Sequence, residues 1–214
     1  MPSPTPATGT PTAPAPASPR AAVLVGEDGV ARCAWAGTDA EYLRYHDEEW
    51  GVPLHTDRKV FEKISLEGFQ AGLSWITILR RRPAFRLAFA DFDIDAVAAF
   101  GPDDIERLVG DAGIIRHRGK IQAVIDNARL TQQLIAESGD GALDRLLWSF
   151  EPPEKLPRPR SFADFVATTP ESTALSTELR RLGYKFVGPT TMYALMQSAG
   201  LVDDHVTGCF RASP

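Results

Sequence analysis

The sequence predicts an all-α fold, and three observations carry this prediction. Apolar residues recur at intervals of three and four over most of the chain, which is the period of a helix with one buried face. Helix-start signals precede several of these segments, including Pro102-Asp103-Asp104 and Thr169-Pro170-Glu171. Nowhere do four or more residues alternate strictly enough between apolar and polar types to predict a sheet.

The composition fits a globular protein with one substantial core, or two lobes that share one. The 214 residues are 43% hydrophobic and 24% charged. The sequence has no apolar run long enough to cross a bilayer and no secretory signal, so with only two cysteines we expect a reducing, cytoplasmic compartment. Because the net charge is −5, an anionic partner must be met by a local basic patch.

The N-terminal segment differs in composition from the rest. Residues 1–20 contain seven prolines among Ala, Thr and Ser, and Arg20 is the only charged side chain. Such a segment cannot bury enough apolar surface to offset its ordering entropy. We therefore predict a disordered tail over residues 1–28 and one folded domain over residues 29–211.

The first predicted helix begins after Asp39, whose side chain can cap it. The helical period places Tyr42, Tyr45 and His46 on one face. Two aromatic rings beside a histidine indicate either a pocket or ordinary core packing.

A long helical segment is predicted from Thr56 or Asp57 to Leu79, interrupted by small residues at 68–72. Small residues let another backbone or a flat ligand approach closely. Glu67 lies next to these small residues, among apolar neighbours. An ionised carboxylate is costly there unless a positively charged group pairs with it. A surface position for Glu67 is the alternative, which its neighbours disfavour.

Further helix starts follow along the chain. We expect Pro83 to start a short helix, Asp93 or Asp95 to cap the next, Pro102 to start another, and Thr169 to cap one that ends near Gly183.

Two turns bounded by glycines, residues 113–120 and 183–188, each lead into a helix. Outward-facing amides at such a turn, with the positive end of the helix behind them, can bind a phosphate. A plain connection between helices is the alternative. The basic runs Arg80-Arg81-Arg82 and Arg116-His117-Arg118 are either anion-binding patches or solvated faces.

Each of the two cysteines has a histidine at a spacing typical of metal ligands. Cys33 precedes His46 by thirteen residues, and His205 precedes Cys209 by four. On a helix the second pair would share one face. Two Cys and two His can form a closed tetrahedral zinc site that ties the ends of the folded region together. Because these spacings match no known zinc finger, buried apolar cysteines with ordinary histidines, or a disulfide, remain alternatives.

Six blocks of sequence stand out, in order, between Arg32 and Cys209. They are RCAW at 32–35, YHDEEWGVP at 45–53, LEGFQAGLSW at 66–75, DAGIIRHRGKI at 111–121, YKFVG at 184–188 and GLVDDHV at 200–206. Together they resemble the 3-methyladenine DNA glycosylase I family, a branch of the helix-hairpin-helix DNA repair glycosylases. The likeness covers the chain except for the tail.

The resemblance implies a helix-hairpin-helix glycosylase architecture with one structural zinc ion joining the two ends of the folded region. The implied zinc ligands are Cys33, His46, His205 and Cys209. The implied base pocket consists of Trp35, Tyr42, Tyr45, Trp50, Glu67 and Trp75. The implied DNA contacts are Lys185 and Gly188 in the main hairpin, and Arg116, Arg118 and Lys120 in a supporting one.

The resemblance also implies an activity. A monofunctional enzyme of this family hydrolyses the N-glycosidic bond of 3-methyladenine in alkylated double-stranded DNA, after flipping the base into the pocket that holds Glu67. We expect such an enzyme to act as a monomer. The alternatives are a zinc-stabilised DNA-binding module without activity and a glycosylase that also accepts 7-methylguanine.

One departure from the family pattern concerns catalysis. The family has Asn-Asp-His where this chain has Asp203-Asp204-His205. Asp203 therefore lies where related glycosylases place a catalytic carboxylate, and it is a second catalytic candidate beside Glu67. We favour a structural role, in which Asp203 or Asp204 caps a last helix or orients a zinc ligand. Ala34 and Phe69 also depart from the family pattern, conservatively.

Overall fold

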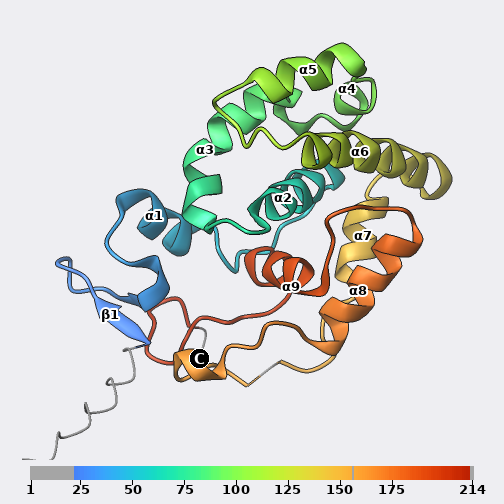
Figure 1. Ribbon diagram of the computed structural model, residues 1–214. Coiled ribbons are helices and arrows are strands. Elements are labelled where there is room, and N and C mark those ends of the chain that lie inside the picture. The colour runs from blue at the N-terminus through green and yellow to red at the C-terminus, as the bar shows by residue number, and fades with distance from the viewer. Residues whose placement is uncertain (1–21, 156, 213–214) are drawn as a thin grey trace, which may run out of the picture.

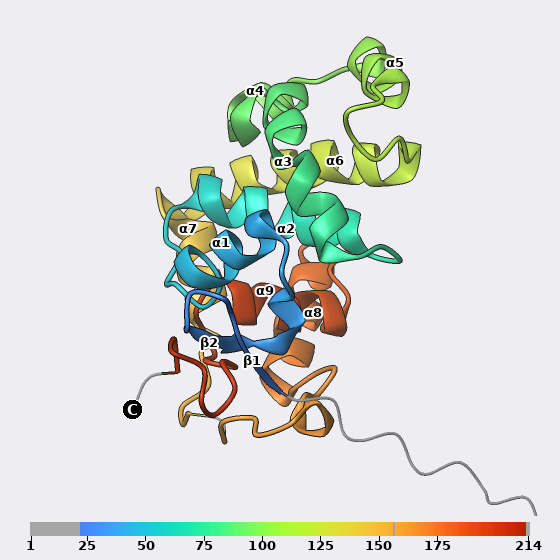
Figure 2. The same cartoon turned by 90° about the vertical axis from the view of Figure 1, so that its left-hand side faces the viewer.

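The computed structural model describes residues 22–155 and 157–212, and its architecture is helical (Figures 1 and 2). The α-helices are α1 (Ala40–Glu48), α2 (Asp57–Gln70), α3 (Trp75–Ala88), α4 (Ile94–Ala98), α5 (Pro102–Gly110), α6 (Arg118–Ser138), α7 (Ala142–Trp148), α8 (Pro170–Arg181) and α9 (Pro189–Ser198). Strands β1 (Val23–Val25) and β2 (Ala31–Cys33) form an antiparallel hairpin. Short 3-10 helices cover Ala34–Ala36, Ala90–Phe92 and Phe162–Asp164.

Helix α2 lies at the centre of the molecule, in contact with α3, α6, α7 and α9 (Figure 1). Every residue from Val60 to Phe69 except Glu62 is buried, so this helix has almost no solvent face. A helix buried on all sides is a rigid platform for polar side chains that project from it.

The two ends of the described chain lie side by side (Figure 2). The amide of Phe210 donates to the carbonyl of Ala31 at 2.8 Å, and the amide of Thr207 donates to the carbonyl of Pro159 at 2.8 Å. The C-terminal segment therefore closes over the β-hairpin.

Most of the predicted helix starts are confirmed. The side chains of Asp39, Asp93 and Thr169 each accept a hydrogen bond from a backbone amide in the first turn that follows. Pro102 is the first residue of α5. These signals were readable because a cap depends only on neighbouring residues.

Two predictions about the segment after Asp57 were wrong. It is not one helix, because α2 ends at Gln70 and α3 begins at Trp75, with Gly72 between them at a φ of 84°. Pro83 does not start a helix but lies inside α3, where it removes one hydrogen bond to Leu79 without ending the helix.

The predicted boundary of the tail also needs correction. Strand β1 lies within residues 22–28, which the sequence assigned to the tail, and it pairs with β2 from Val23 to Val25. This short aliphatic run is stabilised by its partner strand, which local composition does not reveal. The rest of the predicted tail, residues 1–21, lies outside the described residues. In the described part of the chain, no helix is long and apolar enough to cross a membrane.

Candidate functional site

A cavity of about 230 Å³ lies beside α2 and collects all six residues of the predicted base pocket, which are Trp35, Tyr42, Tyr45, Trp50, Glu67 and Trp75. Five further residues line it that the sequence did not single out, which are Gln70, Phe165, Ala194, Gln197 and Ser198. The lining comes from the 3-10 helix before α1, from α1 and the turn after it, α2, the start of α3, the loop before α8, and α9. The cavity therefore exists only in the folded chain.

Aromatic rings form most of the cavity wall and pack against one another. The ring of Trp35 lies 4.9 Å from that of Trp50 and 5.2 Å from that of Tyr42, centroid to centroid. The rings of Tyr45 and Trp75 are 5.5 Å apart. Such edge and tilted contacts fix the ring planes. The cavity is thus pre-shaped for a flat ligand.

Glu67 is the one acidic side chain among the described residues of this lining, and it is only 3% exposed. Burial raises the pKa of its carboxyl group, and the nearby ammonium group of Lys63 acts against this shift. Its Oε1 accepts from the hydroxyl of Ser198 at 3.3 Å and lies 3.3 Å from Lys63 Nζ. Its Oε2 is buried without a hydrogen-bond partner.

A buried donor lies in the same cavity without a partner, the indole Nε1 of Trp75. Unpaired buried polar atoms are costly and are rare in folded proteins. One acceptor on Glu67 and one donor on Trp75 therefore leave the cavity suited to a ligand that has both kinds of group.

Lys63 is a charged residue beside the cavity that the sequence reasoning missed. It precedes Glu67 by one helical turn, and its side chain is 9% exposed. A Lys and a Glu four residues apart on a predicted helix are a readable sign of an ion pair. The sequence argument required a positive partner for Glu67 but did not look along the same helix.

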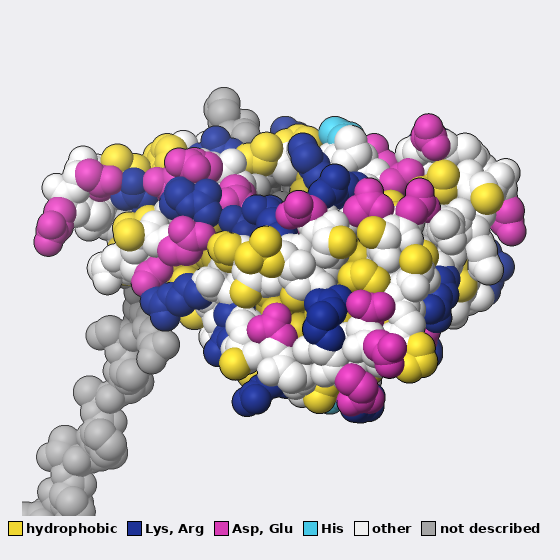
Figure 3. All heavy atoms as spheres, turned by 90° about the horizontal axis from the view of Figure 1, so that it is seen from above, with side chains coloured by type: hydrophobic (Ala, Val, Ile, Leu, Met, Phe, Trp, Pro, Cys, Tyr) yellow, Lys and Arg dark blue, Asp and Glu magenta, His cyan; other side chains and the backbone are white. Residues whose placement is uncertain are grey.

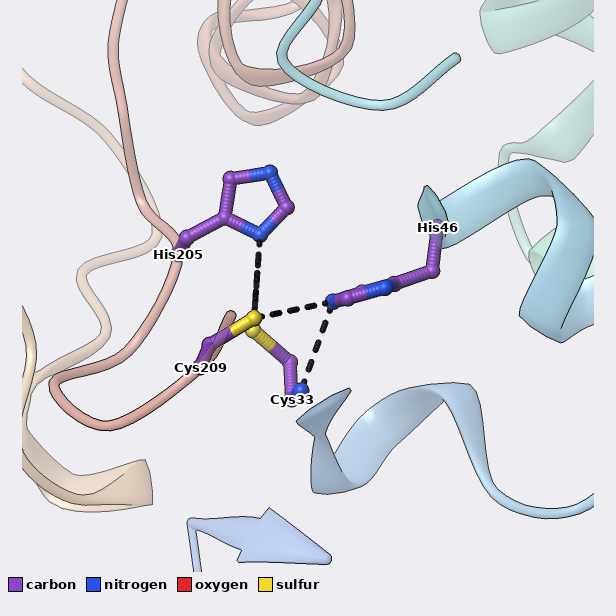
Figure 4. A group of neighbouring side chains, drawn as sticks. All are labelled: Cys33, His46, His205 and Cys209. Carbon is purple, nitrogen blue, oxygen red and sulfur yellow. Dashed lines mark hydrogen bonds between the residues drawn. The ribbon is translucent and has the colours of Figure 1, made fainter. Parts of the chain in front are cut away.

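The four predicted metal ligands form a second buried cluster next to this cavity (Figure 4). Cys33 ends β2, His46 lies on α1, and His205 and Cys209 come from the C-terminal segment. Their ligand atoms all lie within 4.8 Å of one another, and both cysteines are free, which excludes the disulfide. The expectation of a helix over 205–209 was wrong, because a turn from Val206 to Cys209 brings this pair together instead.

Both histidine rings present a lone pair to the sulfur atoms. The Nδ1 of His46 lies 2.8 Å from Asp47 Oδ1, and the Nε2 of His205 lies 3.2 Å from the carbonyl oxygen of Trp50. Each of these nitrogens donates its proton outwards, so the opposite nitrogen of each ring is left as a ligand atom. Partners of this kind commonly fix the orientation of histidines that bind a metal.

The distances between the ligand atoms fit a tetrahedral metal site. Cys209 Sγ lies 3.4 Å from His46 Nε2 and 3.6 Å from His205 Nδ1, and Cys33 Sγ lies 3.7 Å from His205 Nδ1. A tetrahedral zinc ion, with its usual bond lengths, places sulfur and nitrogen ligands about 3.5 Å apart. The cluster can therefore hold such an ion without rearrangement.

The cluster and the cavity share two walls. The ring of Trp35 lies 5.2 Å from that of His46, and the ring of Trp50 lies 4.6 Å from that of His205, centroid to centroid. Both indole rings also line the cavity. The Cys/His cluster thus packs against the residues that shape the cavity.

Asp203 is not among the side chains that line the cavity. Its Oδ2 accepts from Arg158 at 2.7 Å, and its Oδ1 accepts from the amide of His205 at 3.2 Å. Asp204 is buried and accepts from the hydroxyl of Tyr193 at 2.6 Å. Neither caps a helix, because no helix follows up to residue 212, and both instead fix the segment that carries His205.

The predicted DNA-contacting residues differ in exposure. Lys185 and Arg118 are exposed and form ion pairs with Asp126 and Glu106, each at 2.7 Å, and Arg116 is exposed as well. Gly188 is the N-cap residue of α9.

Lys120 must be removed from the predicted DNA contacts. It is 7% exposed, and its ammonium group donates to the carbonyls of Phe69 and Ala71 at 2.9 and 2.7 Å. These carbonyls are at the end of α2, where a cation satisfies the unpaired acceptors. Lys120 therefore caps α2.

The run Arg80-Arg81-Arg82 is neither a basic patch nor a plain solvated face. Arg80 pairs with Asp39, Arg82 pairs with Glu49, and Arg81 donates to the carbonyls of Ala112 and Gly113. On the face seen from above α4, α5 and α6, basic and acidic side chains are interspersed (Figure 3). No extended basic area covers that face.

The turn between α8 and α9 is fixed tightly. The side chain of Asn127 bonds both the amide and the carbonyl of Lys185, at 2.9 and 3.1 Å. Phe186 follows with a φ of 58° and is 40% exposed. A Cβ atom on Gly68 would lie 3.3 Å from Phe186 Cβ, so the small residue lets this turn approach α2, as the sequence predicted.

Residues 35–212 match the family model for methyladenine glycosylase. The chain belongs to the methyladenine glycosylase family. It is 49% identical over 179 residues to the DNA-3-methyladenine glycosylase 1 of Escherichia coli, an alignment that covers 83% of this chain and 95% of the relative. It is 43% identical to the DNA-3-methyladenine glycosylase of Haemophilus influenzae, with 83% of this chain and 96% of the relative covered.

Solved structures of methyladenine glycosylases have the same fold. A crystal structure of a 3-methyladenine DNA glycosylase I superposes with a TM-score of 0.80 at 47% identity, over 85% of this chain and all of that one. The enzyme from Staphylococcus aureus, solved in a study of 3-methyladenine recognition, gives a TM-score of 0.80 at 34% identity, over 86% and 97% of the two chains.

Proposed function

We propose that this chain removes 3-methyladenine from alkylated double-stranded DNA by hydrolysing the N-glycosidic bond, and that it acts as a monomer. The glycosylase activity follows from membership of the family and from 49% and 43% identity to enzymes of that activity. The observation that supports the substrate is the buried Glu67 carboxylate, with one oxygen unpartnered, in an aromatic cavity.

Recognition depends on the charge of the substrate. Methylation at N3 of a deoxyadenosine residue leaves the base cationic, and a cation gains roughly 0.5–2 kcal/mol from each aromatic face that it contacts. Glu67 Oε2 is free to accept from the exocyclic amine, in a hydrogen bond strengthened by charge. Undamaged adenine is neutral and gains neither contribution in full.

The base must leave the duplex to reach this cavity. Extrusion requires the loss of stacking and pairing, which is less costly for a lesion that pairs poorly. Glu67 is only 3% exposed, so a base has to leave the helical stack to contact its carboxylate. Base flipping into the cavity therefore contributes to the selectivity.

The chemistry requires little help from side chains. The bond between N9 and C1′ breaks with its electron pair going to the cationic base, which leaves as a neutral molecule. Water supplies the oxygen that bonds to C1′ and loses a proton to solvent. Glu67 is the only carboxylate among the described residues of the lining, so its role is to hold and orient the base, and its charge stabilises the positive charge that develops on the sugar.

The turn at residues 183–188 would hold the DNA backbone, in a helix-hairpin-helix arrangement formed with α8 and α9. Exposed Lys185 lies on it, and Gly188 precedes the N-terminus of α9, where backbone amides can donate to a phosphate. The second turn offers exposed Arg116 and Arg118 as a supporting contact. Such contacts position a duplex without reading its sequence.

Zinc is the metal that the four-residue cluster suits best. Two thiolates and two imidazoles in a closed tetrahedral arrangement leave no position for water, which is typical of a structural site. When bound, the ion would supply stability by joining β2, α1 and the C-terminal segment.

The experiment is an excision assay on duplex DNA treated with a methylating agent, with the released bases identified by chromatography. We expect free 3-methyladenine well above a blank without protein, and no release from untreated DNA. Binding to DNA without release of any base would show a DNA-binding module instead. Release of 7-methylguanine at a similar rate would show a broader glycosylase.

A further inference from the structure

Lys63 lies beside the aromatic cavity, in a position that suits a cation. Its Nζ donates to the hydroxyl of Tyr45 at 2.9 Å and lies 3.3 Å from Glu67 Oε1. It also lies 4.0 Å from the centre of the Trp75 ring and 5.0 Å from that of the Tyr45 ring. Two aromatic faces and a carboxylate are the same groups that recognise a cationic base in the proposed function.

The presence of this lysine changes the electrostatics of the pocket. An ionised Glu67 beside a protonated Lys63 makes a neutral pair, whereas Glu67 alone would leave a net negative charge. Burial lowers the pKa of Lys63, and the charge of Glu67 acts against this shift. More distant charges that act on Lys63 are those of Arg82 and Glu49. A cationic base that enters the pocket therefore meets a like charge unless Lys63 moves.

We infer that Lys63 is a specificity-determining residue of this pocket: its ammonium group pairs with one oxygen of Glu67 and repels a charged base that binds to the other oxygen. This inference rests on the proposed function, because it concerns how Glu67 recognises the base. A neutral base is not repelled by the ammonium group. Lys63 therefore weakens the preference for charged bases that Glu67 alone would give.

Lys63 lines a second cavity and not the aromatic cavity. This second cavity, of about 310 Å³, shares Tyr45 and Ser198 with the aromatic cavity and includes Lys63 in its lining. Glu49 and Glu62 also line it, paired with Arg82 and Arg86. The ammonium group therefore acts on a bound base through its charge and leaves the aromatic cavity open.

The reaction removes this repulsion. Cleavage converts the cationic base into a neutral one, on which the ammonium group of Lys63 has little electrostatic effect. Lys63 thus opposes binding of the charged substrate and not of the neutral product.

The test compares two ligands that differ chiefly in charge. One is 3,9-dimethyladeninium, which is permanently cationic and carries a methyl group in place of the sugar. The other is 3-methyladenine at pH 9.0, where the free base is neutral. Binding is measured by quenching of tryptophan fluorescence in the wild type and in Lys63→Met and Lys63→Gln, whose melting temperatures are measured as well. Loss of Lys63 favours protonation of Glu67, which would itself alter the affinity for a cation. Titrations at pH 7.5 and 9.0 therefore separate this protonation from the loss of the lysine charge.

We expect both variants to bind the cation about tenfold more tightly, since a charge within 4–6 Å commonly alters the free energy of a neighbouring charge by this factor or more. Affinity for the neutral base should change less than about twofold. Lys63→Arg, which keeps the charge, should bind like the wild type. Lys59→Met, one turn earlier on the same helix and exposed, is the matched control and should have no effect.

An unchanged or weaker affinity for the cation in both uncharged variants would overturn the inference. An equal change for both ligands would overturn it too, because this would show a steric or structural role. The wild-type excision assay separates this failure from failure of the proposed function. If 3-methyladenine is released but the variants show no charge-selective gain, only the role of Lys63 is wrong.

Discussion

The Cys/His cluster and the aromatic cavity are both buried and polar, and Trp35 and Trp50 contact both, yet the two differ in how well their polar atoms are satisfied. In the cluster, both histidines have outward hydrogen-bond partners, and their remaining nitrogens face the sulfur atoms. In the pocket, one oxygen of Glu67 and the indole nitrogen of Trp75 have no partner. A closed arrangement indicates a structural role, and an open one indicates a site for a ligand.

The strongest test of this difference is loss of a metal ligand. We expect Cys209→Ser to lower the metal content of the protein and to destabilise the fold by ~4 kcal/mol, as the loss of a structural metal commonly does. Metal analysis and thermal denaturation measure both quantities. Thr207→Ala, at an exposed position of the same segment, is the control and should keep its metal. A variant at Cys209 with wild-type metal stoichiometry would remove this residue from the ligand set.

The role of Glu67 in the pocket can be tested through the pH dependence of excision. Because burial raises the pKa of Glu67, we expect activity to fall on the acid side at a pH above 4.5, its ordinary value, as the carboxylate gains a proton. The same shift has the opposite effect on stability. A carboxyl group with a raised pKa in the folded state contributes most to stability when protonated, and this contribution declines as pH rises from 4.5 through the folded pKa.

The expected loss of activity at acid pH can be distinguished from acid unfolding of the protein. Excision rates and melting temperatures are measured together between pH 4 and 9. Loss of activity while the melting temperature holds supports titration of Glu67, and loss of both together would contradict it.

A smaller effect is expected at Asp203. This side chain pairs with Arg158 and accepts from the amide of His205, outside the lining of the pocket. We expect Asp203→Asn to keep the excision rate within about threefold, whereas loss of a general base or acid typically costs at least ~100-fold. Single-turnover kinetics decide between these roles, and a loss on the larger scale would make Asp203 catalytic.

The smallest effect concerns the DNA backbone. We expect Lys185→Gln to lower the slope of log affinity against log salt for undamaged duplex by about one unit, since one phosphate contact is lost. Metal content and the single-turnover rate at saturating protein should not change. Lys155→Gln, at an exposed position in the loop before α8, is a control of the same chemistry. An unaltered slope would mean that Lys185 serves only its pairing with Asp126.

The sequence predicted the features that depend on local chemistry. The caps at Asp39 and Thr169 were readable, because each acts within three residues. The boundary between α2 and α3 at Gly72 was hard to predict, because the apolar periodicity continues across it from α2 into α3. Helix α7 was missed, since it has only seven residues and follows Gly139 and Gly141.

Features that depend on distant contacts were harder to predict. Lys120 looked like a DNA contact because its neighbours are basic, but its acceptors lie near position 70, far away in the sequence. Spacing alone left the partners of Cys33 and Cys209 open, and the resemblance to the family identified them. Lys63 is different, because its pairing with Glu67 is local and could have been read from the sequence.

The central claim is that the carboxylate of Glu67 recognises the damaged base while the metal cluster serves only the fold. The most direct measurement is the single-turnover rate of 3-methyladenine release by Glu67→Gln, on protein whose metal content and melting temperature have been measured. We predict a loss of about 100-fold, as expected for a charged hydrogen bond of up to ~3 kcal/mol, with full metal content and a cooperative unfolding transition, although loss of the ion pair with Lys63 lowers the melting temperature. A wild-type rate in this variant would contradict the account.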